Sequence, residues 1–172
     1  MCKHQDAPPA QGKYLAITMA LLTEADKKNI RCTWAKLFEN PEEHGKSIVI
    51  KLFTDYPETK KYFKTIPTEG NLQANPLVRF HGRRVMVAVN QVVENLDNWK
   101  QACRILDRLA DKHRTSHSVE VENFQYIFQV MECVLRNVLG NEFNSRVSTS
   151  WKKLFTLLFE QIEETYGSSS QS

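Results

Sequence analysis

The amino-acid sequence predicts an all-α domain of seven to eight helices. Apolar residues recur at the three- and four-residue spacing of amphipathic helices along most of the 172-residue chain. The sequence shows no strict apolar–polar alternation typical of a half-buried strand, no hairpin signal and no internal repeat. A chain of this length is expected to form one domain with a sizeable core.

We divide the chain into three segments. Residues 1–20 contain two prolines and a glycine among scattered polar residues, and we expect them to form a flexible leader. Residues 21–166 carry the helical pattern and form the domain. Residues 167–172 read Gly-Ser-Ser-Ser-Gln-Ser, a composition typical of a disordered tail.

The first two helices have clear start signals. Residues 23–26 (Thr-Glu-Ala-Asp) come close to a capping box and place carboxylates at the positive end of the helix dipole. The apolar stripe that follows consists of Ile30, Trp34, Leu37 and Phe38. Pro41, followed by two glutamates, begins the second helix, because proline is favoured in a first turn. Its apolar face consists of Ile48, Val49, Leu52 and Phe53.

The remaining elements follow from breaks in the helical pattern. Tyr56-Pro57 ends the second helix, and a short turn of helix carries residues 59–63. A proline and a glycine within residues 64–75 predict a loop. Long helices are then predicted at about residues 76–96, 100–113, 121–139 and 144–166, with the short connections of a compact bundle.

Two histidines, His81 and His113, lie on apolar stripes of different predicted helices. His81 shares one helix face with residues 85, 88 and 92, and His113 follows Leu109 by four positions. A neutral imidazole nitrogen is a good iron ligand, and a haem needs one strong axial ligand between apolar walls. The pair therefore predicts two imidazoles facing each other across a flat, metal-bearing cofactor. On helix pattern alone, a hydrogen-bonded core histidine or an acid–base catalyst is also compatible with each position.

Gly45 and Gly82 lie inside predicted helices, where each costs about 1 kcal/mol relative to alanine. One interpretation is that the two helices cross closely there, which would set the register of neighbouring His81. The other is that both glycines are tolerated on surfaces that face solvent.

Composition excludes several classes of protein. The net charge of +3 and the pI near 8.6 are mild, and the pairs Arg83-Arg84 and Lys60-Lys61 form no concentrated basic face, so we expect no nucleic-acid partner. No apolar run is long enough to span a membrane. We expect a monomer, because no exposed apolar stripe is obvious in the sequence.

The four cysteines show no C-x-x-C spacing, and no secretory leader precedes them. We therefore expect free thiols in the reducing cytoplasm. Three of them lie inside helical patterns and are expected to be small core residues: Cys32, Cys103 and Cys133.

Six pieces of sequence, taken in order, carry a resemblance to a known family. They are Trp34-Ala-Lys-Leu, Tyr56-Pro57, Lys61-Tyr62-Phe63, His81-Gly82-Arg83-Arg84-Val85-Met86, Val92-Val93-Glu94-Asn95-Leu96 and Trp151-Lys-Lys-Leu. Over about residues 23–166 the chain resembles the globins, and within them the vertebrate cytoglobin-like and globin-Y-like branch. One piece would carry little weight, but the ordered set with matching spacing is specific. The resemblance implies the globin fold, in which the helices enclose a haem.

The resemblance implies a role for each site residue, with haem b (iron protoporphyrin IX) as the cofactor. His113 corresponds to the proximal ligand, whose Nε2 binds the iron. His81 corresponds to the distal histidine, which donates a hydrogen bond to bound O2 or coordinates the iron itself. Phe63 corresponds to the ring that wedges against the porphyrin. Further lining residues are Val49, Val85, Leu109, Val119 and Phe124, and the partners of the haem propionates are Arg84 and His117.

The function implied is reversible binding of O2 for storage, supply, transport or sensing, with CO and NO as further ligands. The alternative is a haem enzyme, such as a nitric oxide dioxygenase or a nitrite reductase. That alternative needs an external reductase, because the sequence contains no flavin or nicotinamide module. A third hypothesis is a helical interaction domain without a cofactor. The resemblance also favours iron held by both His81 and His113 in the resting state.

The sequence departs from this family pattern at two places. Only 17 residues separate Phe63 from His81, fewer than the resemblance leads us to expect, so a small helix in that connection is expected to be incomplete. Pro41 and Arg83 stand where cytoglobin carries its cysteine pair, so a disulfide switch of that type is not expected.

Overall fold

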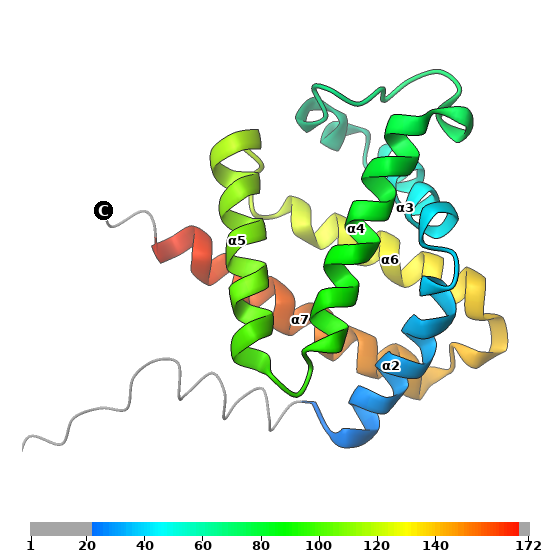
Figure 1. Cartoon of the computed structure of the whole chain (residues 1–172), viewed down its shortest axis with the longest axis vertical. Coiled ribbons are helices and arrows are strands. Elements are labelled where there is room, and N and C mark those ends of the chain that lie inside the picture. Colours follow the sequence, from blue (N-terminus) through cyan, green and yellow to red (C-terminus); the bar gives the residue numbers. More distant parts are fainter. Residues whose placement is uncertain (1–21, 169–172) are drawn as a thin grey trace, which may run out of the picture.

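The computed structural model describes residues 22–168, and these residues are helical throughout apart from short connections (Figure 1). The α-helices are α2 (Glu24–Phe38), α3 (Pro41–Asp55), α4 (Pro76–Glu94), α5 (Trp99–His117), α6 (Asn123–Leu139) and α7 (Ser145–Ser168). Short 3-10 helices are η1 (Pro57–Tyr62), η2 (Leu72–Ala74) and η3 (Gly140–Glu142). The described range contains no strand, so the all-α prediction is confirmed. The predicted leader lies outside the described residues.

Two helix ends extend beyond the prediction. Helix α5 continues four residues beyond His113, because its polar last turn is held by side chains: Arg114 pairs with Asp111 at 2.8 Å, and the Thr115 hydroxyl donates to the Asp111 carbonyl at 2.8 Å. Helix α7 runs to Ser168, two residues into the segment expected to be the tail. The connection over residues 64–75 contains the three-residue helix η2, which fits an incomplete small helix.

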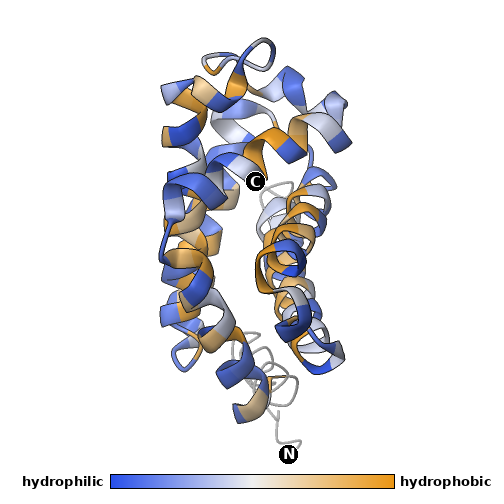
Figure 2. Ribbon diagram, turned by 90° about the vertical axis from the view of Figure 1, so that its right-hand side faces the viewer, coloured by the Kyte–Doolittle hydropathy of each residue, from blue (hydrophilic) through white to orange (hydrophobic). Residues whose placement is uncertain are grey.

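The core has two parts. The larger part joins all of the long helices, and among its fully buried side chains are Trp151, Ile30, Met86 and Leu135. A smaller cluster consists of Val49, Phe53 and Val78, with Phe63 packed against both parts. Figure 2 shows the helices in two layers, with hydrophobic positions along the helices of both.

Helix α2 is fastened to α7 through the buried carboxylate of Asp26. The predicted capping box is present: the Thr23 hydroxyl accepts from the Asp26 amide at 3.1 Å, and Asp26 accepts from the Thr23 amide at 3.0 Å. The same carboxylate accepts hydrogen bonds from the Ser150 hydroxyl and from Lys153 Nζ, both at 2.8 Å. A capping residue of the first described helix therefore also bonds to the last helix.

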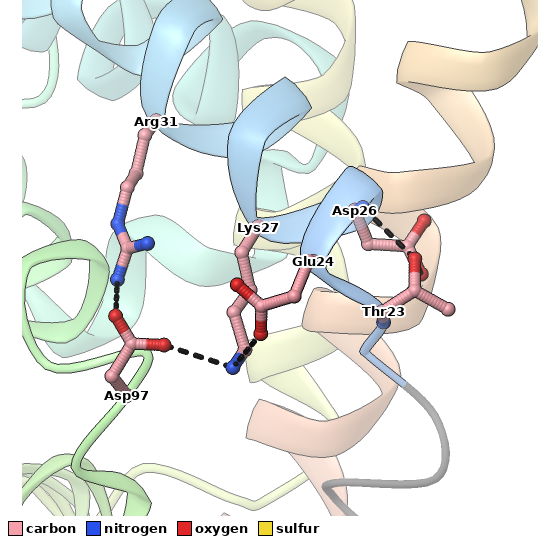
Figure 3. Close-up of polar contacts among 6 residues, drawn as sticks. All are labelled: Thr23, Glu24, Asp26, Lys27, Arg31 and Asp97. Carbon is pink, nitrogen blue, oxygen red and sulfur yellow. Dashed lines mark hydrogen bonds and ion pairs between the residues drawn. The ribbon is translucent and has the colours of Figure 1, made fainter.

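The turn between α4 and α5 is tied to α2 by an exposed ion-pair cluster. Lys27 and Arg31 of α2 donate to Asp97 at 2.8 and 2.6 Å, and Lys27 also pairs with Glu24 at 2.8 Å (Figure 3). Exposed pairs contribute little individually, but here two of them converge on one carboxylate. These ion pairs hold the turn between α4 and α5 against α2.

Helices α3 and α4 cross in direct backbone contact at Gly45 and Gly82, and both glycines are buried. A Cβ atom on Gly45 would overlap the carbonyl group of Gly82, and one on Gly82 would overlap the carbonyl group of Gly45. The close-crossing interpretation is therefore confirmed, and the solvent-facing interpretation is wrong. Because only glycine permits this approach, the crossing sets the register of α4.

Two expectations about the surface are wrong. Leu77, Phe80 and Val87 of α4 are exposed, with Phe80 at 62%, so an exposed apolar stripe does exist and the argument for a monomer loses its premise. Cys32 is exposed instead of buried, because it lies opposite the apolar stripe of α2. Within residues 22–168, none of the helices is long and apolar enough to cross a membrane.

We predict that Gly45→Ala destabilises the protein by about 3 kcal/mol, because the new methyl group must separate the two helix backbones. Urea unfolding followed by circular dichroism measures this. Gly167→Ala is the control, since a Cβ there meets no neighbouring atom. It should change the free energy of unfolding by less than about 1 kcal/mol. Equal effects of the two variants would contradict the crossing.

A second prediction concerns the Asp26 carboxyl. Burial raises its pKa, but hydrogen bonds from Lys153, Thr23 and Ser150 outweigh burial and lower the pKa to about 2, from an ordinary value of 3.8. The depressed pKa contributes about 2 kcal/mol of stability, which is present above pH 3.8 and is lost as the pH falls towards 2.

Asp26→Asn should therefore lower the free energy of unfolding by about that amount at pH 7 and flatten its pH dependence in acid. Unfolding curves collected from pH 7 to pH 2 check both effects. Glu24→Gln, on the exposed side of the same helical turn, should change stability by no more than about 0.5 kcal/mol. An acid profile of Asp26→Asn identical to that of the unsubstituted protein would be evidence against the prediction.

Candidate functional site

The two predicted imidazoles lie on helices that diverge from a shared turn. His81 is in the second turn of α4, and His113 is near the end of α5. Figure 1 shows the helices close together at the turn after Glu94 and spread apart at the ends that carry the histidines. Both side chains are half-buried, and the charge of His113 is among the causes that lower the pKa of His81. The structure therefore places the two half-buried imidazoles at the ends of α4 and α5 that lie away from the shared turn.

The tautomer of His113 follows from its hydrogen bond. Its Nδ1 lies 2.8 Å from the backbone carbonyl oxygen of Leu109, one turn earlier in α5. A carbonyl oxygen can only accept, so Nδ1 must carry the proton and donate it. Burial lowers the pKa of His113 and favours the neutral ring. The lone pair on Nε2 is then free to bind a metal, and the ring orientation is held by the bond on its other nitrogen.

His81 is held neutral chiefly by burial. Burial, with smaller contributions from the charges of His113, Arg84 and His117, lowers its pKa to about 4. The ring of Phe63 packs edge-on against it, with 5.3 Å between centroids and an interplanar angle of 89°. A neutral imidazole in this position can either bind a metal through a lone pair or donate one N–H bond to a small polar ligand.

Phe63 is the C-cap residue that follows η1, and it connects the histidine to the smaller core cluster. Its ring also contacts Phe53 at 4.7 Å and 80°. Sequence reasoning assigned Phe53 only to the apolar face of its helix. The signal that links it to the site is its position four residues after Val49, because residues at that spacing share one helix face. Val49 is buried and belongs to the same cluster.

The wall on the His113 side is built by α6 and α7. Phe124 of α6 is buried and contacts the His113 ring at 5.4 Å. Tyr166 of α7 lies behind it, 6.1 Å from the Phe124 ring, and donates its hydroxyl to the Val119 carbonyl at 2.9 Å. Burial raises the pKa of Tyr166 to about 12, so it is a neutral donor. No feature of the sequence identified this tyrosine, because its partners are long-range.

The lining fits a flat, largely apolar group. Val85, Leu109 and Val119 pack against the core but remain half-exposed, which leaves apolar surface beside the imidazoles. The two polar donors, His81 and His113, are neutral nitrogen ligands of the type that haem iron accepts. The residues present therefore fit a haem.

Arg84 and His117 are exposed and lie beside this lining. The His117 ring is 5.9 Å from that of His113, and the positive charge of Arg84 contributes to lowering the pKa of both His81 and His113. Because they combine exposure with proximity, these side chains can meet anionic groups at the solvent edge of a bound cofactor.

We predict that Phe63→Ala destabilises the cofactor-free protein by about 2 kcal/mol, because a ring shared by two clusters and His81 is removed. Phe80→Ala is a matched control: Phe80 adjoins His81 in sequence but is 62% exposed, so its loss should change stability by less than about 0.5 kcal/mol. Urea unfolding of both variants measures the difference. A Phe63 variant no less stable than the control would exclude the packing role described above.

Comparison with known proteins shows which family the chain resembles. A family model described as Globin matches residues 46–162. The chain is 30% identical to Cytoglobin-1 of Oryzias latipes over 148 residues, which are 84% of each chain. It is 31% identical to Cytoglobin-2 of Danio rerio over 148 residues, covering 84% of this chain and 83% of the relative. It is 33% identical to Hemoglobin subunit alpha-D of Sturnus vulgaris over 146 residues, covering 85% and 99%.

Proposed function

Because this chain belongs to the globin family, a family of haem proteins that bind O2, we propose that it holds haem b between His113 and His81 and binds O2 reversibly. The observation that carries the proposal is the hydrogen bond from His113 Nδ1 to the Leu109 carbonyl. It leaves Nε2 unprotonated and aims the ring, which is what a proximal ligand requires.

Haem, when bound, supplies an iron that takes up diatomic ligands such as O2, CO and NO. The residues around the haem determine the affinity for these ligands and how far water is excluded from them. On the distal side, His81 donates one N–H bond to a polar ligand, and this bond is strong because the surroundings have a low dielectric constant. Val49 and Val85 exclude water from the same side. Val49 is aliphatic and adds no second donor, which favours release over tight trapping.

The solvent edge of the haem carries two propionates, and we assign them to Arg84 and His117. Both side chains are exposed and cationic or titratable, as a partner of a carboxylate must be. On the inner side, Phe63, Leu109, Val119 and Phe124 supply the apolar contacts.

Resting coordination by both histidines is part of the proposal. The low pKa of His81 keeps its ring neutral at physiological pH, so no proton blocks its lone pair. In that state His81 must move away before an external ligand binds, and the apparent affinity falls by the fraction of protein that is open.

The second candidate function is a haem enzyme that consumes nitric oxide or reduces nitrite. The exposed cation Arg84, beside an exposed apolar residue, Phe80, gives an external reductase a surface near the site. We place the protein in the reducing cytoplasm, in keeping with the free thiols of Cys32, Cys103 and Cys133. Rapid nitric oxide turnover with a reducing system would favour the enzyme, and slow autoxidation with negligible turnover would favour the O2 carrier.

The first test is the visible spectrum of the purified, dithionite-reduced protein, with hemin added if it is colourless. Sharp, split bands are expected for iron held by both histidines. His81→Leu should convert them to one broad band, because one axial ligand is lost. His44→Gln is the control, since His44 bonds the Leu37 carbonyl, away from the site, and should leave the bands unchanged.

The outcomes separate the parts of the proposal. A broad band in the unsubstituted protein would overturn coordination by both histidines but keep the haem assignment. The absence of any haem absorption after hemin addition would remove the haem function itself and favour a cofactor-free interaction domain.

A further inference from the structure

The hydroxyl of Tyr62 joins two segments that are 58 positions apart in sequence. It donates to a Glu120 carboxylate oxygen at 3.1 Å and accepts from the Asn123 side-chain amide at 3.3 Å. The same amide donates to the Glu120 backbone carbonyl at 3.0 Å, and Lys61 Nζ lies 3.8 Å from the Glu120 carboxylate. We call the bonded set Tyr62, Glu120 and Asn123 the latch.

On one side, the latch is connected through the backbone to Phe63 of the distal wall. Tyr62 is the last residue of η1 and directly precedes Phe63, whose amide is bonded to the Lys60 carbonyl at 3.0 Å. The Phe63 ring in turn packs edge-on against His81. A displacement of Tyr62 therefore moves Phe63 away from the distal imidazole.

On the other side, the latch is connected to the end of α5, the helix that carries His113. Glu120 belongs to the corner of residues 118–122 that joins α5 to α6. In that corner the Val119 amide donates to the carbonyl of His113 at 3.1 Å, and the Val119 carbonyl accepts the Tyr166 hydroxyl. Ser118 holds a left-handed conformation (φ 53°), which turns the chain back toward the site. The corner is thus bonded both to the proximal histidine and, through the latch, to the distal segment.

From this arrangement we propose that Tyr62 is a positioning residue: it ties the Phe63–His81 side of the site to the Val119–His113 side and thereby retains the haem. The inference rests on the proposed haem function. A flat group held between two walls leaves only when the walls separate, so a bond between the walls must break first. The latch contains such bonds, and it lies at an edge of the site where Glu120 is exposed and Tyr62 is half-buried.

Tyr62→Phe is the direct test, because it removes the hydroxyl and leaves the ring. Loss of hemin to an excess of cofactor-free acceptor globin should become about fivefold faster, the effect expected for a hydrogen bond to a carboxylate at a partly exposed site. Glu120→Gln should have a similar but smaller effect. The double variant should lose hemin no faster than Tyr62→Phe, because Glu120→Gln weakens the same bond that Tyr62→Phe already removes.

Tyr56→Phe is the matched control. Its hydroxyl is also on the segment that carries Phe63, but it donates to Gln129 of α6 and does not reach the corner. The variant should lower the unfolding midpoint about as much as Tyr62→Phe does and leave the rate of hemin loss unchanged. If the two variants lose hemin equally fast, or if Tyr62→Phe loses it at the unsubstituted rate, the positioning role is overturned.

A second readout needs no haem. Hydrogen–deuterium exchange of the cofactor-free protein should show faster exchange in Tyr62→Phe at both the Phe63 and the Val119 amides. Faster exchange at Phe63 alone would mean that the latch does not couple the two sides, and would overturn the proposal. If the unsubstituted protein binds no hemin, the haem function fails, and the exchange result still decides whether the latch joins the two segments.

Discussion

The close approach of α3 and α4 is the constraint on which the site depends. At Gly45 and Gly82 the two backbones are in contact, so neither helix can rotate or slide without collision. His81 is the residue before Gly82, and the direction of its side chain is therefore set by the crossing and not by its own contacts. The same two helices supply the cluster of Val49, Phe53 and Val78, against which Phe63 packs. A substitution at either glycine would thus displace the distal imidazole through the backbone of α4.

Burial has opposite consequences for the ionisable groups of this chain. At Asp26 it is outweighed by donors that converge on the carboxylate, and the charged form is retained. At His81 and His113 burial dominates, and the neutral form is retained. The difference matters because a protonated imidazole has no free lone pair with which to bind a metal, and two protonated imidazoles side by side repel each other. The Asp26 carboxylate that joins α2 to α7 therefore stays charged, and the imidazoles of His81 and His113 stay neutral.

Local patterns in the sequence predicted most of the helices, and long-range contacts account for what they missed. The capping box at Thr23 and the proline at the start of α3 are signals within one turn, and both helices begin as predicted. The end of α5 was placed too early because its last turn is held by polar side chains instead of an apolar stripe. The roles of Tyr62 and Tyr166 have no signal in the sequence, since each acts through a partner on another element. The position of Cys32 was misjudged because membership of a helix does not specify which face a small residue occupies.

The carboxylate of Asp26 also bears on how the chain can mature during synthesis. Its bonding partners Ser150 and Lys153 lie 124 and 127 positions downstream, so α2 can pack against α3 and α4 early but cannot bond to α7 until residues 150–153 have been translated. Until then its stripe of Ile30, Trp34 and Leu37 has only part of its native cover. Loop closure over such a separation is slow compared with the formation of a helix. The apolar stripe of α2 therefore lacks its α7 partner until residues 150–153 have been synthesised, and apolar surface exposed in this way makes a folding intermediate prone to aggregation.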